Sequence, residues 1–303
     1  MNLPRRSNLL ALLLSFGVAA ASNPAAAEDI DIFSGASGGA SANPNVLIVL
    51  DNRAAWDDNS QHFPGSMASG QAELQAIMSV VGGLGAGINV GLMTYNRSDG
   101  GGYINAAIEP MDTTNKPIFL ANVQYIYNNF RNPVFKVSST FAWDDMLFDA
   151  YKYFGGYTSP AHATDNVAGT PTDRLHFGTA VYAQNVDPTV ADVRGYTNST
   201  FATYASSSTA FNACAKNYII FISNPSVTLS QGTASLLTNV GGDATVPNPY
   251  SITSKGALAP NWARFLFLTD VSPAPGQQNV VTHTIDVYGD KPSSGPFPTS
   301  TSW

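Results

Sequence analysis

The stretch over residues 44–56, PNVLIVLDNRAAW, constrains the fold of this 303-residue chain more than any other. Residues 46–50 form a continuous apolar run, which is the pattern of a strand that is buried on both faces. Asp51 follows this run directly, and polar loop residues come next. Because open α/β sheets bind ligands outside the carboxyl ends of their strands, Asp51 lies where a metal or ligand site is expected.

Strand and helix patterns alternate along the rest of the chain. Apolar runs predict strands over residues 88–95 and 217–223, an alternating pattern predicts a final strand over 280–287, and 103–109 is expected to be a hairpin or an edge strand. Helical spacing predicts helices over residues 66–81, 117–130, 140–154, 229–240 and 257–268. This alternation predicts an α/β fold with a doubly wound, mainly parallel central sheet flanked by helices.

The amino-terminal residues 1–27 predict a secretory signal peptide. Two arginines precede a short apolar stretch at 9–21, and three alanines at 25–27 form a small-residue cleavage site. The apolar stretch is too short to span a bilayer, and no later stretch reaches the roughly 18 apolar residues that a transmembrane helix needs. We therefore predict an exported protein, in the periplasm, on the outer surface or on a pilus. A Ser/Gly/Ala-rich linker is expected at 28–43.

The charge of the exported chain narrows the classes of partner. Removal of the two arginines of the signal leaves 12 basic and 21 acidic residues, a net charge of −9. An acidic chain of this kind argues against nucleic acid or anionic membranes as non-specific partners. Cys214 is the only cysteine, so the chain forms no internal disulfide.

Five segments, in order and spacing, resemble the von Willebrand factor A domain of the PilY1/PilC family of type IV pilus tip adhesins. They are the strand ending in Asp51, NVGLMTYN at 89–96, LFDAYKYFGG at 147–156, CAKNYIIFISNP at 214–225, and WARFLFLTDVSPAPGQQNVVTHTIDVYG at 262–289. The resemblance implies a von Willebrand factor A-like, Rossmann-like domain over residues 44–290. We expect a long insertion at about 155–208 and a Pro/Ser-rich tail at 291–303.

In that family the first strand leads into an Asp-x-Ser-x-Ser metal loop, completed by a Thr from a second loop and an Asp from a third. Asp51 is retained here, but Arg53 and Ala55 replace the two serines, and Asn224 replaces the third-loop Asp. Thr140 is expected to be the second-loop Thr. The resemblance therefore implies a degenerate metal site and no cofactor. If the site were still active, Asp51 and Thr140 would be its Mg²⁺ ligands.

The side chain of Arg53 has two alternative placements. Its guanidinium, which is permanently charged, either occupies the place of the cation and pairs with Asp51, or points into solvent. The sequence does not decide between them.

No residue pattern supports catalysis, so we predict that the protein is not an enzyme. GASGG at 35–39 matches a nucleophile elbow in its letters, but it lies in the linker and not at a strand-to-helix turn. The four histidines lack metal-ligand spacing. Asp144, Asp145 and Asp149 are expected on the solvated face of the helix over 140–154.

Two functions remain. The first is an exported binding module, a type IV pilus-associated or bacterial cell-surface adhesion or assembly protein. Arg53, Trp56, His62 and the insertion would then meet a protein or surface ligand, with minor pilins among the candidates. The alternative is a structural spacer of the pilus machinery that binds no ligand at the former metal edge.

Overall fold

The computed structural model describes residues 43–57, 63–95, 102–133, 135–137, 143–155, 215–223, 234–245, 258–271 and 277–287. The predicted signal peptide, most of the linker, most of the insertion and the tail lie outside these residues.

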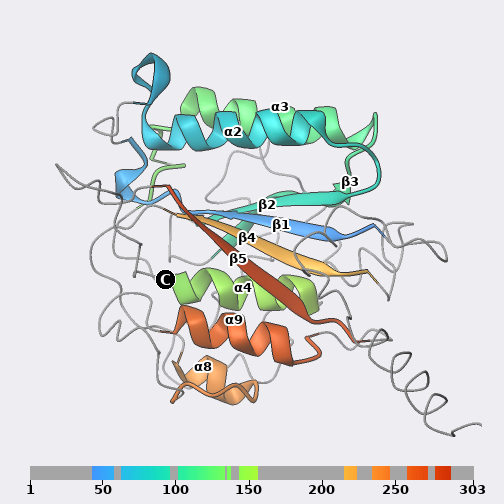
Figure 1. The fold of residues 1–303 in the computed structure, drawn as a ribbon. Coiled ribbons are helices and arrows are strands. Elements are labelled where there is room, and N and C mark those ends of the chain that lie inside the picture. Colours follow the sequence, from blue (N-terminus) through green and yellow to red (C-terminus); the bar gives the residue numbers. More distant parts are fainter. Residues whose placement is uncertain are drawn as a thin grey trace, which may run out of the picture. The chain divides into compact units, whose positions relative to one another are not determined.

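A five-stranded sheet of order β3-β2-β1-β4-β5 forms the centre of the described structure (Figure 1). Its strands are β1 (Asn45–Leu50), β2 (Asn89–Tyr95), β3 (Gly102–Pro110), β4 (Asn217–Ser223) and β5 (Val280–Asp286). All neighbouring pairs are parallel except β2 and β3, which are antiparallel. The prediction of an α/β fold with a mainly parallel sheet is confirmed, and the segment expected as a hairpin or edge strand forms β3.

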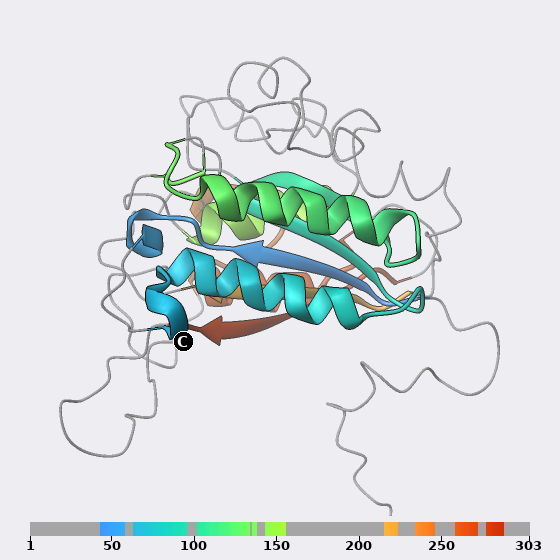
Figure 2. The same ribbon diagram turned by 90° about the horizontal axis from the view of Figure 1, so that it is seen from above.

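Helices cover both faces of this sheet. One face carries α2 (Ser69–Gly83) and α3 (Asn115–Asn129), which lie side by side in Figure 2. The other carries α4 (Trp143–Gly155), α8 (Ala234–Asn239) and α9 (Ala259–Leu268). Two short 3₁₀ helices, η2 (Ala54–Asp57) and η3 (Pro64–Ser66), lie between β1 and α2. Within the described segments, no helix combines the length and apolar character needed to cross a membrane.

The central strand β1 is buried along its whole length. Leu47 and Val49 pack into an apolar cluster with α4 and α9, whereas Ile48 and Leu50 pack into a second cluster with α2 and α3. Successive side chains of a strand point to opposite faces, so a strand between two helical layers needs an apolar residue at every position. This requirement explains the uninterrupted apolar run that precedes Asp51.

The expectation of a solvated acidic face on α4 is wrong. Asp144, Asp145 and Asp149 are all buried. One physical reason is the position of α4 beside β3. Asp149 Oδ2 accepts a hydrogen bond from the Gly102 backbone N at 2.6 Å, and the Tyr153 hydroxyl accepts one from the Ile108 backbone N at 2.9 Å. Polar side chains of α4 therefore satisfy backbone groups of β3 that would otherwise be buried without a partner.

Candidate functional site

The candidate site lies at the carboxyl ends of β1 and β4. These two strands are parallel neighbours, and the Asp51 backbone N donates to the carbonyl of Ile222 at 2.9 Å. The strand order runs outward in opposite directions from this pair, with β2 and β3 on one side and β5 on the other. Ligands of open α/β sheets bind at such a reversal, because the connections on its two sides diverge and leave a crevice.

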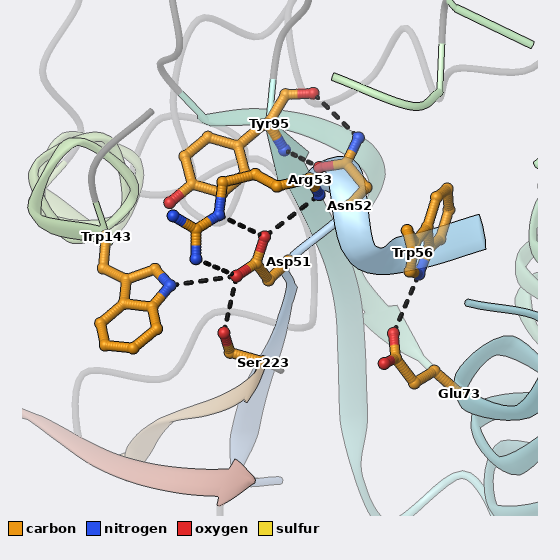
Figure 3. Close-up of polar contacts among 8 residues, drawn as sticks. All are labelled: Asp51, Asn52, Arg53, Trp56, Glu73, Tyr95, Trp143 and Ser223. Atoms are coloured by element: carbon orange, nitrogen blue, oxygen red, sulfur yellow. Dashed lines mark hydrogen bonds and ion pairs between the residues drawn. The ribbon is translucent and has the colours of Figure 1, made fainter. Parts of the chain in front are cut away.

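The Asp51 carboxylate is fully buried at this point and receives five hydrogen bonds (Figure 3). Oδ1 accepts from the Arg53 backbone N at 3.1 Å and from Arg53 Nε at 2.7 Å. Oδ2 accepts from Arg53 Nη2 at 2.6 Å, Trp143 Nε1 at 3.0 Å and Ser223 Oγ at 2.6 Å. A carboxylate offers about four lone-pair sites, so the chain itself saturates this one.

Arg53 turns back onto Asp51, and its side chain is fully buried. Its Cζ lies 5.3 Å from the ring centroid of Trp143 and 5.7 Å from that of Tyr95. Burial, the largest single influence, would lower the pKa of Arg53, but the charge of Asp51, the charge of Tyr95 and the hydrogen bond to Asp51 together outweigh it and raise that pKa above its ordinary value. The guanidinium therefore stays charged, and the solvent-facing alternative is wrong.

Asn52, between Asp51 and Arg53 in the chain, fixes the loop that follows β1. Its Oδ1 accepts from the Tyr95 backbone N at 2.8 Å, and its Nδ2 donates to the carbonyls of Tyr95 and Phe135. Its own carbonyl accepts from the Val137 backbone N at 3.1 Å. The end of β1 is thus tied to the end of β2 and to the segment that follows α3.

The position of Trp56 differs from the one predicted, which was at a surface that meets a partner. It is fully buried, and its indole Nε1 donates to Glu73 Oε2 on α2 at 2.9 Å (Figure 3). Burial raises the pKa of Glu73 to about 8, and the nearby charge of Asp51 adds to that effect, although the bond from Trp56 opposes it. Trp56 points inward because η2 packs against α2, where the indole joins the second apolar cluster.

The structure brings Asp51 and Arg53 together and places Ala55 in η2. The other predicted site residues, Thr140, Asn224 and His62, lie outside the described residues. Sequence reasoning missed Trp143, Ser223 and Glu73. Ser223 had a usable signal, because it ends a predicted strand and a neighbour of β1 would present it beside Asp51.

The described residues at this edge do not fit a divalent cation. Mg²⁺ needs oxygen ligands with free lone pairs in octahedral geometry. Both oxygens of Asp51 are already used, and the positive Arg53 guanidinium lies where it would repel a second cation. Across the part of the chain that the structure describes, no group of three or more His, Cys, Asp or Glu side chains is arranged to hold a metal ion.

The chain matches no protein-family model, and no curated protein sequence matches it. The arrangement of residues at the carboxyl ends of β1 and β4 is therefore the structural basis for a proposed function.

Proposed function

We propose that this chain is an exported, non-enzymatic binding module with a von Willebrand factor A-like domain that works without a metal. The closed ion pair of Asp51 and Arg53 is the observation that carries the proposal. It lies at the point of the sheet where such domains are expected to bind partners, and it supplies from within the chain the positive charge that a cation would bring.

The strand order supports the domain assignment. An order of 3-2-1-4-5 with helices on both faces agrees with the doubly wound class, whose sheets continue outward from a central first strand. The antiparallel β3 is compatible with this class, since mainly parallel sheets often carry one antiparallel edge strand. The assignment to the pilus-tip family rests on the resemblance of the five sequence segments.

The proposed partner is a protein or surface ligand of a type IV pilus or a bacterial cell surface. The test is binding of the exported protein to isolated pili and to immobilised cells, with Mg²⁺ or with EDTA. We expect a low-micromolar or tighter affinity that EDTA leaves unchanged. Arg53→Lys keeps the charge but loses the fork of two parallel hydrogen bonds, so it is expected to weaken binding. Lys116→Ala, which removes a cation of α3 that donates to the carbonyl of Leu84, is the control.

The second candidate is a structural spacer of the pilus machinery. The burial of Trp56 favours it, because the aromatic side chain expected to anchor a partner serves the core instead. Incorporation into pili without any binding to surfaces would support the spacer and contradict the binding module. Binding to pili or cells that EDTA abolishes would contradict the metal-free mechanism.

A further inference from the structure

Glu73 and Trp56 form a buried contact between α2 and η2 that the proposed function does not use. Trp56 is fully buried, and its backbone N donates to the carbonyl of Arg53 at 2.9 Å. The indole lies against Gly70, where an added Cβ would come within 2.4 Å of Nε1. The contact with Glu73 therefore holds the 3₁₀ turn that follows the Asp51–Arg53 pair against the first turns of α2.

The surroundings of Glu73 favour a neutral carboxyl group. Glu73 is 4% exposed and belongs to the buried face of α2, with Leu74 and Ile77. Trp56 Nε1 gives it one hydrogen bond, and among the described residues Oε1 has no partner. A buried carboxylate with a single donor loses far more hydration than it regains. A neutral carboxyl group in the same place forgoes only one hydrogen bond.

The charged groups near this contact do not relieve that cost. From the end of β1, Asp51 acts on Glu73 with a charge of the same sign. On η2, Asp57 turns to Lys136 at 2.6 Å, where both side chains are partly exposed. From the end of α3, Phe130 offers only its ring, which packs edge-on against the indole of Trp56.

We propose that Glu73 is a proton-operated latch that keeps η2 docked on α2. With the carboxyl group protonated, Trp56 stays buried and η2 stays closed. Ionisation forces the carboxylate to take up water, and separation of η2 from α2 is the movement that admits it. The latch is independent of the identity of any partner.

The direction of the pH effect follows from the difference between the pKa of Glu73 in the closed state and its pKa in the open state. Burial first, then the charge of Asp51, raises the pKa of Glu73 from an ordinary value of 4.5 to about 8 in the closed state. The closed state therefore binds more protons than the open state between these two values. Its stability falls as pH rises through that window and levels off above about pH 8.

Amide hydrogen exchange of the full chain tests the latch at the backbone N–H of residue 56. We expect its protection factor to fall at least about tenfold between about pH 6 and pH 8 and then to level off. Glu73→Gln, which has the same shape and no titration, should abolish this dependence. Glu109→Gln, the same change on β3, should leave it intact.

Trp56→Phe provides a second variant that keeps an aromatic ring and the backbone amide but lacks the indole N–H. It removes the hydrogen bond that favours the ionised carboxylate, so the midpoint of the transition should move to higher pH. A wild-type protection factor that is constant across the range would overturn the latch, as would an unchanged pH dependence in Glu73→Gln. Exchange at residue 56 that never exceeds exchange at Ile48 would also overturn it, because the opening would then be global unfolding.

Discussion

The two ends of the central strand β1 bury polar side chains with different chemistry. At the amino end, Asn89 Nδ2 donates to Asn45 Oδ1 at 2.8 Å, and Asn45 Nδ2 donates to Asn217 Oδ1 at 2.9 Å. All three amides are buried and neutral. At the carboxyl end, the one carboxylate of Asp51 collects five donors, three of them from Arg53.

The polar side chains at the amino end of β1 have a structural role, whereas those at the carboxyl end are arranged like a binding site. The asparagines are register partners on three neighbouring strands, and each passes one hydrogen bond to the next, so the row fixes the register of the sheet. At the other end, donors from the adjacent loop and from two segments distant in the sequence converge on one charged group. A cation bound at this edge would pair with the Asp51 carboxylate, and here the Arg53 guanidinium takes that place.

The largest effect is expected when Arg53 is removed. Arg53→Ala leaves the Asp51 carboxylate buried without its cation, and it should lower the free energy of unfolding by about 3–5 kcal/mol. Urea denaturation measures this loss. Arg53→Lys should retain part of the stability, because the charge remains while the two-bond fork is lost. A loss below about 1 kcal/mol for Arg53→Ala would show that the pair is not tightly coupled.

Breaking the amide row should cost somewhat less. Asn45→Leu leaves the Asn89 amide N and the Asn217 amide O buried without their partners, at a total cost of about 3 kcal/mol. The same denaturation experiment applies, and the loss should not depend on salt, because no charge is involved. Asn43→Ala, which alters the exposed end of the row, is the control and should cost less than about 1 kcal/mol. Equal losses for the two variants would contradict a buried, cooperative row.

Two glycines near opposite ends of α2, Gly70 and Gly82, allow the same substitution to be compared in a tightly packed and in an open environment. A Cβ at Gly70 would lie 2.4 Å from the Trp56 indole, whereas a Cβ at Gly82 meets nothing within 4 Å. Gly70→Ala should therefore destabilise the protein by about 2 kcal/mol, because the indole must shift. Gly82→Ala should stabilise it by about 0.5 kcal/mol, since alanine is the better helix former. Thermal melts of both variants would settle the signs, and a neutral Gly70→Ala would mean that η2 is loosely packed.

The smallest mutational effect is expected at the exposed ion pair of Asp57 and Lys136. Its charged atoms are 2.6 Å apart, as close as those of the buried pair, but both side chains are about one-third exposed. Lys136→Ala should cost less than about 1 kcal/mol, and added salt should erase the difference from wild type. A larger, salt-resistant loss would show that distance alone, and not burial, decides the strength of the two pairs.

Much of the fold could be predicted because the strands carry strong local patterns. The run before Asp51 and the segment Asn217–Ser223 are apolar enough to identify β1 and β4 without tertiary information. The amide row also left a signal, since three parallel strands each begin with an asparagine. That signal has meaning only once the strands are known to be neighbours in register.

The site could be predicted only in part, because its contacts join distant segments. Asp51 was placed correctly by its position after an apolar run, and the pairing of Arg53 was left open because a side chain two residues away can turn either way. Trp143 and Ser223 lie 92 and 172 residues from Asp51. The end of a predicted strand pointed to Ser223 only if β4 is known to lie beside β1, and no local pattern encodes the contact of Trp143. The solvated face predicted for Asp144, Asp145 and Asp149 failed for the same reason, since it considered the helix without its neighbours.

The central claim is that Arg53 closes the edge at which a metal would bind. Calorimetric titration of Mg²⁺, Mn²⁺ and Ca²⁺ into the protein tests it most directly, with thermal melts alongside, because a ligand of the native state raises stability with its concentration. We predict no heat of binding and no change in melting temperature up to millimolar metal. A clear one-site signal that Asp51→Ala abolishes would contradict the claim, since it would show that the carboxylate exchanges Arg53 for a cation.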